Sequence, residues 1–131
     1  MGNDKKLFYH VWFATKNRKW LLLAEIDEKV KEFISQVASE KHIDLLACET
    51  MVNHIHLLLR VAPGDLPKAM FLLKGISSRR IFQAFPELKL DARTIGFWQA
   101  RYAFKIIPDN ALKSVKSYIA TQKERPDKFE S

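Results

Sequence analysis

Residues 54–61 read HIHLLLRV, and their alternation of apolar and polar side chains is the clearest structural signal in the chain. Side chains of a strand alternate between its two faces. The apolar residues fall at every second position and would share one face: Ile55, Leu57, Leu59 and Val61. The opposite face would carry His54, His56, Leu58 and Arg60. The pattern predicts a strand with one face packed against helices and two histidines on the other.

Three other segments are predicted as strands, and the first of them is rich in aromatic and β-branched residues. They are Leu7–Thr15, Ile43–Met51 and Arg101–Ile107. A basic loop at residues 16–19 follows the first of these strands, and only a short turn separates the second from residues 54–61. The stretch from Leu88 to Trp98 has no clear pattern.

Apolar residues at helical spacing predict a helix from Glu25 to His42. A second helix begins after the break at residues 63–65, where Asp65 can cap it, and runs to about Phe85. A last helix, which Asp109 can cap, extends to about Glu124. The residues expected to pack this last helix against the sheet are Leu112, Val115 and Ile119.

The order of the elements is therefore β-α-β-β-α-β, followed by one more helix. This is the split β-α-β pattern of ferredoxin-like folds, in the α+β class. It predicts a four-stranded antiparallel sheet with residues 7–15 and 54–61 in its central strands and the first two helices on one face. The last helix is additional and must lie elsewhere. No repeat, low-complexity tract or linker interrupts the chain, so residues 1–131 are predicted to form a single domain.

The charge of the chain is unevenly distributed. The 131 residues are 47% hydrophobic and carry a net charge of +7. Residues 1–65 hold nine basic and nine acidic side chains, whereas residues 66–131 hold thirteen and six. A basic half favours a polyanion such as nucleic acid as partner. Cys48 is the only cysteine, which excludes an intramolecular disulfide and a Cys-rich zinc site.

Membrane segments are not expected in this chain. No apolar run exceeds five residues, far below the roughly 20 that a membrane helix needs. The polar N-terminus lacks the apolar core of a signal peptide. We therefore expect a soluble protein of the cytoplasm with no membrane partner.

His54 and His56 are the first candidate for chemistry. Two histidines that are two residues apart on a strand project side by side and can reach one metal ion. Taken alone, the pair reads more readily as surface histidines on a half-exposed sheet. On the last helix, Tyr118 and Gln122 stand at positions i and i+4 and share a face. By themselves they would be a tyrosine at the edge of the core and a solvated glutamine.

Together these motifs resemble the single-tyrosine HUH transposases. This family comprises the TnpA-like enzymes of small bacterial insertion sequences and the related tyrosine transposases associated with repeated extragenic palindromes (REP). The specific features are the His-x-His strand and the later Tyr-x-x-x-Gln helix, in this order and at this separation. The similarity also includes residues 73–75 and, as loose patterns, residues 9–13 and 97–102.

The resemblance implies roles for four residues. His54, His56 and Gln122 match the metal ligands of the family, and Tyr118 matches its nucleophile. The family cuts single-stranded DNA, forms a 5′-phosphotyrosine and frees a 3′-hydroxyl, and a second 3′-hydroxyl then rejoins the DNA. The resemblance also implies a homodimer, DNA substrates with hairpin ends, and a bacterial or archaeal host.

The residue types agree with that chemistry. Two imidazoles and one amide are neutral, so a bound ion keeps its full charge for the scissile phosphate. Such a set suits Mg²⁺ or Mn²⁺ when substrate is present. A structural zinc site would need a fourth ligand, and none is evident. No residue can be named as the general base for Tyr118.

Six basic residues are candidates for DNA contacts. They are Lys68, Lys74, Arg79, Arg80, Arg101 and Lys105. Trp98 and Tyr102 could stack on unpaired bases, although core packing is the simpler interpretation of both. His10 could sit beside the site if its strand pairs with residues 54–61, although a packed or partly exposed histidine outside the metal shell is the simpler interpretation. Asn53 is expected to be a turn residue.

Two alternative functions stay open at this stage. The chain can be a domesticated relative that processes genomic palindromes instead of moving an element. It can also be a non-catalytic nucleic-acid-binding module of ferredoxin-like fold. That module would bind DNA in a salt-dependent manner without metal-dependent cleavage.

Overall fold

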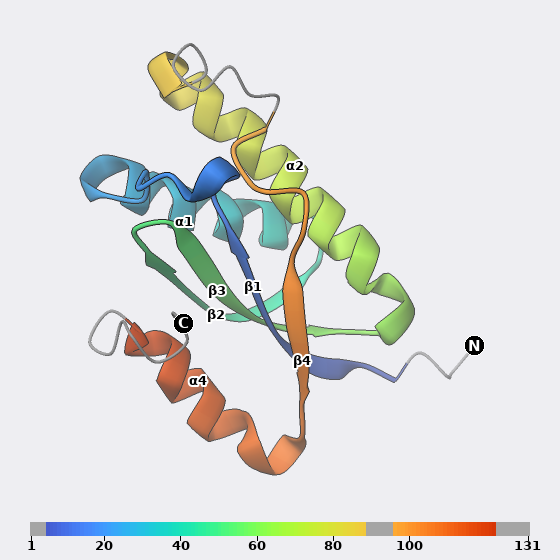
Figure 1. Cartoon of the computed structure of the whole chain (residues 1–131). Coiled ribbons are helices and arrows are strands. Elements are labelled where there is room, and N and C mark those ends of the chain that lie inside the picture. Colours follow the sequence, from blue (N-terminus) through green and yellow to red (C-terminus); the bar gives the residue numbers. More distant parts are fainter. Residues whose placement is uncertain (1–4, 89–95, 123–131) are drawn as a thin grey trace.

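Strands β1 (Leu7–Ala14) and β3 (His54–Val61) lie in the centre of a four-stranded antiparallel sheet. The computed structural model describes residues 5–88 and 96–122. The edge strands are β2 (Asp44–Met51) and β4 (Ala103–Ile107), and the sheet order is β2-β3-β1-β4 (Figure 1). This order confirms the predicted ferredoxin-like α+β arrangement, with the two expected strands in the middle.

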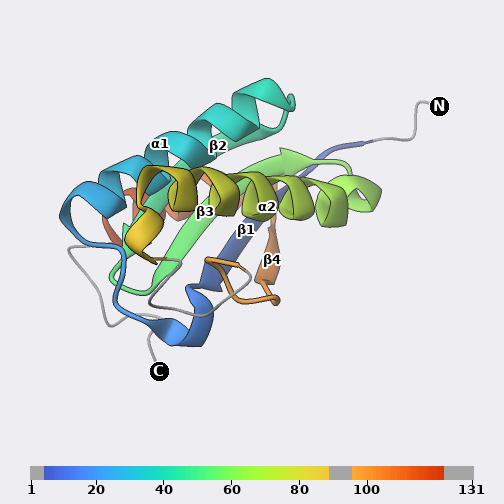
Figure 2. The same ribbon diagram turned by 90° about the horizontal axis from the view of Figure 1, so that it is seen from above.

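Helices cover both faces of the sheet. Helices α1 (Ala24–Glu40) and α2 (Leu66–Ala84) lie side by side over one face, as Figure 2 shows from above. Helix α4 (Leu112–Ala120) lies across the other face, where it contacts β2 and β3. The additional helix predicted from the sequence therefore occupies the face that α1 and α2 leave open.

The ends of several elements differ from the predicted ones. β4 begins at Ala103 instead of Arg101, and the carbonyls of Ala100 and Arg101 just before it accept hydrogen bonds from the Lys74 ammonium. Helix α4 ends at Ala120, where the Thr121 hydroxyl donates back to the carbonyls of the last turn. The remainder of the predicted helix, residues 123–124, lies outside the described residues.

The predicted aspartate caps are wrong. Asp65 and Asp109 each lie in a short 3₁₀ turn that precedes the helix, at Pro63–Asp65 and Asp109–Ala111. The Asp65 side chain makes no capping hydrogen bond, and α4 starts one residue after the turn that contains Asp109. Each aspartate is itself part of the 3₁₀ turn, whereas the residue that caps the N-terminus of a helix normally has an extended backbone.

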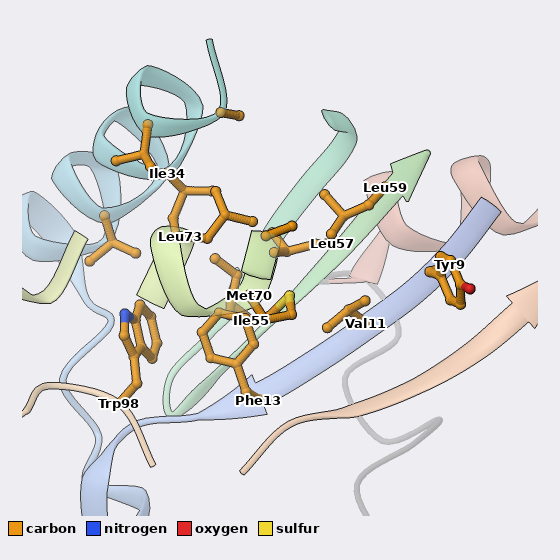
Figure 3. Packing of buried hydrophobic residues seen from close by; sticks show 14 of the residues in the cluster. Tyr9, Val11, Phe13, Ile34, Ile55, Leu57, Leu59, Met70, Leu73 and Trp98 are labelled. Atoms are coloured by element: carbon orange, nitrogen blue, oxygen red, sulfur yellow. The ribbon is translucent and has the colours of Figure 1, made fainter. Parts of the chain in front are cut away.

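The main core fills the space between the sheet and helices α1 and α2 (Figure 3). The apolar face of β3 points into it, as its alternation predicts. Burial of one such side chain stabilises the fold by roughly 1.5–3 kcal/mol. The residues at its centre include Val11, Phe13, Ile34, Ile55, Leu57, Leu59, Met70 and Leu73.

A smaller cluster holds α4 against the opposite face. Ile119 is fully buried and packs with Leu58 of β3 and Ile107 of β4. Leu112 and Val115 are half-buried beside them, which confirms the predicted packing stripe of the last helix. Among the helices described here, none combines the length and apolar character that crossing a membrane requires.

Candidate functional site

The pairing of β1 with β3 brings three histidines to one face of the sheet. Ala14 lies opposite His54, Trp12 opposite His56, and His10 opposite Leu58. Residues directly opposite each other in an antiparallel pair point to the same side. His10, Trp12, His54 and His56 therefore share the face that α4 covers.

His54 and His56 are close together and buried. Their ring centroids are 5.0 Å apart, and their exposed fractions are 7% and 1%. The interpretation of the pair as surface histidines is therefore wrong.

His10 joins this pair through a hydrogen bond. Its Nε2 atom lies 2.9 Å from Nδ1 of His56, and both rings are buried. His10 is packed, as predicted, and because β1 pairs with β3 it also sits beside the site; its bond to His56 was not predicted. The signal that could have found it is the register, since His10 is two residues before the partner of His56. Asn53 does more than turn the chain, because its Oδ1 lies 2.9 Å from Nδ1 of His54.

Burial keeps two of these rings uncharged. It lowers the pKa of His10 to about 4, with a smaller contribution from the charge of Lys105. Burial lowers the pKa of His56 to about 3, and the neighbouring His10 and His54 add to the effect. At neutral pH each of these two rings therefore carries one N–H group and one lone pair, the form in which imidazole binds metals.

Helix α4 carries Tyr118 on this face of the sheet, and Gln122 lies two residues beyond the end of the helix. The Tyr118 ring is edge-on to the His10 ring, with centroids 6.4 Å apart. Gln122 is fully buried, so its interpretation as a solvated residue is wrong. Within the part of the chain that the structure describes, neither its amide oxygen nor its amide nitrogen has a hydrogen-bond partner. A buried polar group without a partner costs about 1–3 kcal/mol.

A cleft opens beside the histidines. Its lining includes His54, His56 and Trp12, together with Tyr102 and the basic residues Arg18 and Arg101. Of the predicted DNA contacts, Arg101 thus lies at the site. Lys105 lies directly opposite His10 in the antiparallel pair of β4 with β1, and it is exposed. Arg18 belongs to the basic loop at residues 16–19 and is not among the six predicted DNA contacts.

The other predicted DNA contacts lie on α2, over the opposite face of the sheet. The Lys74 ammonium donates to the carbonyls of Ala100 and Arg101, at 3.0 and 3.1 Å, and burial lowers its pKa. Arg80 binds Glu40 of α1 at 2.6 Å. Lys68 and Arg79 are exposed on the same helix. The structure therefore does not bring the six residues together.

The two aromatic candidates have different environments. Trp98 is buried, packs edge-to-face on Phe13 with ring centroids 4.8 Å apart, and donates its indole N–H to Ser77 at 3.0 Å. Core packing, the simpler interpretation, is confirmed for Trp98. Tyr102 is half-buried and lines the cleft beside the histidines.

Comparisons with known proteins agree on one family. The family model described as "Transposase IS200 like" matches residues 3–122. The ISDra2 transposase TnpA of Deinococcus radiodurans is 29% identical over 125 residues, which cover 95% of this chain and 89% of that protein. The transposase of insertion sequence element IS200 from Salmonella typhimurium is 30% identical over 132 residues and covers 95% of this chain and 86% of its own length.

Solved structures extend the comparison to the fold. A crystal structure from Deinococcus radiodurans, described as that of a transposase, superposes with a TM-score of 0.73 at 32% identity, over 93% of this chain and 95% of that one. A REP-associated tyrosine transposase bound to a REP hairpin has a TM-score of 0.67 at 16% identity, over 94% of this chain and 70% of that one. The latter supports the fold alone. With the family match over residues 3–122, these likenesses show that the chain belongs to the IS200-like transposase family.

Proposed function

We propose that this chain is a metal-dependent transposase that cuts and rejoins single-stranded DNA through a covalent bond to Tyr118. The observation that carries the proposal is the buried amide of Gln122. Gln122 is four residues after Tyr118 and lies just beyond the end of α4, the helix that covers the histidine face. A buried amide without a partner in residues 5–88 and 96–122 is costly to keep, which suits a group that binds a ligand.

The residues present fit a divalent metal ion. In residues 5–88 and 96–122, no group of three or more His, Cys, Asp or Glu side chains could hold a metal by itself. The amide oxygen of Gln122 is a donor of another type, and it suits the role of third ligand that the family resemblance implies. We propose that His54, His56 and Gln122 hold Mg²⁺ or Mn²⁺, both of which accept oxygen ligands, with Mn²⁺ more tolerant of imidazole. When bound, the ion would neutralise charge on the scissile phosphate and help the 3′-oxygen to leave.

Tyr118 would perform the covalent step. A tyrosine hydroxyl, with a pKa of about 10, is a poor nucleophile at neutral pH and must lose its proton as it attacks. Its oxygen forms a bond to the phosphorus, while the bond from phosphorus to the 3′-oxygen breaks and that oxygen gains a proton. In the reverse sense, a second 3′-hydroxyl attacks the phosphotyrosine and regenerates Tyr118. The number of phosphoester bonds is conserved, so neither water nor an energy source is consumed.

The cleft would bind the DNA strand next to the reacting phosphate. Arg18 and Arg101 supply positive charge at its lining, and Tyr102 supplies an aromatic ring on which an unpaired base can stack. Along the proposed path of the DNA strand, each half of the chain therefore supplies one basic residue.

The three tyrosines of the chain allow a complete test. We would incubate wild-type protein and the variants Tyr118→Phe, Tyr9→Phe and Tyr102→Phe with single-stranded DNA from the end of the element and Mn²⁺ or Mg²⁺. Covalent protein–DNA adducts would be resolved on a denaturing gel. Wild type, Tyr9→Phe and Tyr102→Phe are expected to form the adduct, whereas Tyr118→Phe and any sample with a chelator are not.

The same assay separates the alternatives. A wild-type protein that binds DNA but forms no adduct with either ion would be a non-catalytic binding module. An adduct that forms only with genomic palindromes, and not with the ends of an element, would indicate a domesticated enzyme. The kinship to insertion-sequence transposases favours the mobile element.

We also propose that the active form is a homodimer that binds hairpin-ended DNA. The edge strand β4 exposes Phe104 and Ile106 by 49% and 56%, and unpaired edges with apolar side chains are apt to pair with a second chain. Light scattering of the variant Ile106→Lys is expected to report a monomer. Leu23→Lys, at a similarly exposed site before α1, should leave the mass of the dimer unchanged. Competition between a hairpin and an unstructured strand of equal length would test the substrate.

A further inference from the structure

Two side chains hold Nδ1 of His54 and Nδ1 of His56. A neutral imidazole offers one lone pair, so its tautomer decides which nitrogen can bind a metal ion. His54 presents Nδ1 to Asn53 Oδ1 at 2.9 Å, and His56 presents Nδ1 to His10 Nε2 at 2.9 Å. These contacts involve Nδ1 of each ring, so we assign binding of the proposed metal to Nε2.

The bond between Asn53 and His54 has a defined direction. An amide oxygen only accepts hydrogen bonds, so the proton lies on Nδ1 of His54 and the lone pair on Nε2. The bond between His10 and His56 can run in either direction, because each nitrogen can donate or accept. If His10 donated, the proton of neutral His56 would sit on Nε2 and block that nitrogen as a ligand.

We propose that His10 is a positioning residue that accepts the hydrogen bond of His56 Nδ1–H, with Asn53 acting in the same way on His54. The proposal rests on the metal-binding roles of His54 and His56 proposed above. Partners of this kind fix the tautomer and orientation of a ligating histidine and raise its basicity. His10 would thus act through His56 without touching the metal or the DNA.

The surroundings of His10 support a fixed ring. It is only 4% exposed, lies against Trp12 with ring centroids 4.9 Å apart, and faces the Tyr118 ring edge-on. Two aromatic neighbours and the pairing of β1 with both β3 and β4 leave the ring little freedom to turn away from His56. A rigid acceptor on a central strand is suited to holding one tautomer.

Binding of Mn²⁺ to protein without DNA tests the proposal. Free Mn²⁺ would be measured by electron paramagnetic resonance during titration of wild type, His10→Phe, His10→Gln and His56→Ala. Loss of such a partner typically weakens metal binding 10–100-fold, which is the change expected for His10→Phe. His10→Gln is expected to recover part of the affinity, since its amide oxygen can accept the bond. His42→Gln, at an exposed site next to the far end of the sheet, should bind as wild type does.

Nitrogen NMR of the metal-free protein gives a second readout that does not depend on metal binding. Protonated and unprotonated ring nitrogens differ in chemical shift, and we expect His56 to be protonated on Nδ1 in wild type and to become a mixture of tautomers in His10→Phe. A proton on Nε2 of His56 in wild type would overturn the inference. Equal Mn²⁺ affinity of His10→Phe and wild type would do so too, provided that His56→Ala binds weakly. If His56→Ala and wild type bind Mn²⁺ equally, the proposed metal site fails, and the NMR result still decides the inference.

Discussion

Thr15 and Trp98 form an isolated antiparallel bridge that ties the end of β1 to the segment before β4. Two backbone hydrogen bonds of 2.9 Å flank it, from Lys16 N–H to the Phe97 carbonyl and from Gln99 N–H to the Ala14 carbonyl. The bridge places the loop that carries Arg18 beside the segment that carries Arg101. Both arginines can therefore line one cleft although they come from opposite halves of the chain.

Removal of either arginine is expected to weaken binding of single-stranded DNA. Arg18→Ala and Arg101→Ala each delete a positive charge beside the histidines, so fewer counterions are released on binding. The slope of log K against log salt should become shallower by about 0.7 for each phosphate that the variant no longer neutralises. Fluorescence anisotropy with an unstructured labelled strand at several salt concentrations measures this slope. Lys41→Ala removes the same charge at the exposed end of α1 and should leave the slope unchanged. Equal slopes for all three variants would contradict the proposed strand path.

The sequence predicted the sheet and the two packed faces because burial leaves a periodic trace. The alternation in residues 54–61 separates the core side of β3 from the histidine side, and the spacing of Val115 and Ile119 marks the packed side of α4. The places of Arg18 and His10 leave no such trace. They depend on strand register and on a bridge between distant segments, and on Arg18 adopting a left-handed backbone with φ of 53°. The hydrogen bonds of Lys74 could not be predicted for a related reason, because its carbonyl acceptors come from an irregular segment.

Replacement of Gln122 by an apolar residue should stabilise the metal-free protein and weaken its binding of metal. Gln122→Met replaces a buried amide that has no partner among the described residues with an apolar chain of similar length. We expect the free energy of unfolding of the metal-free protein to rise by about 1–2 kcal/mol, since the desolvation cost is removed. Urea denaturation measures this change, and titration with Mn²⁺ should show weaker binding. Gln36→Met is a control at an exposed position of α1, and it is not expected to raise the free energy of unfolding. If Gln122→Met were less stable than wild type, the Gln122 amide would have to make a favourable interaction in the metal-free protein.

The stability of the metal-free protein should fall in mild acid. Burial lowers the pKa of His10 from 6.5 to about 4 and that of His56 from 6.5 to about 3. Below pH 6.5 the unfolded chain therefore binds more protons at these sites than the folded chain does, so the free energy of unfolding decreases as pH falls towards 4. Urea midpoints measured between pH 7 and pH 4 should show this loss. The loss should be smaller in His10→Phe, and an equally steep dependence in that variant would assign the effect to other groups.

Docking of α4 should control activity separately from overall stability. Ile119 is fully buried between α4 and the sheet, and its truncation to alanine is expected to lower the free energy of unfolding by about 2–5 kcal/mol. Ile34→Ala removes a buried side chain of the same size from the cluster under α1 and α2, and provides a matched control. Hydrogen exchange should accelerate in α4 for Ile119→Ala and in α1 for Ile34→Ala, because each substitution weakens the packing of its own helix. Since α4 carries Tyr118, formation of the DNA adduct should then fall further in Ile119→Ala than in Ile34→Ala at equal loss of stability. Equal decreases of adduct in the two variants would mean that the position of α4 does not limit the reaction.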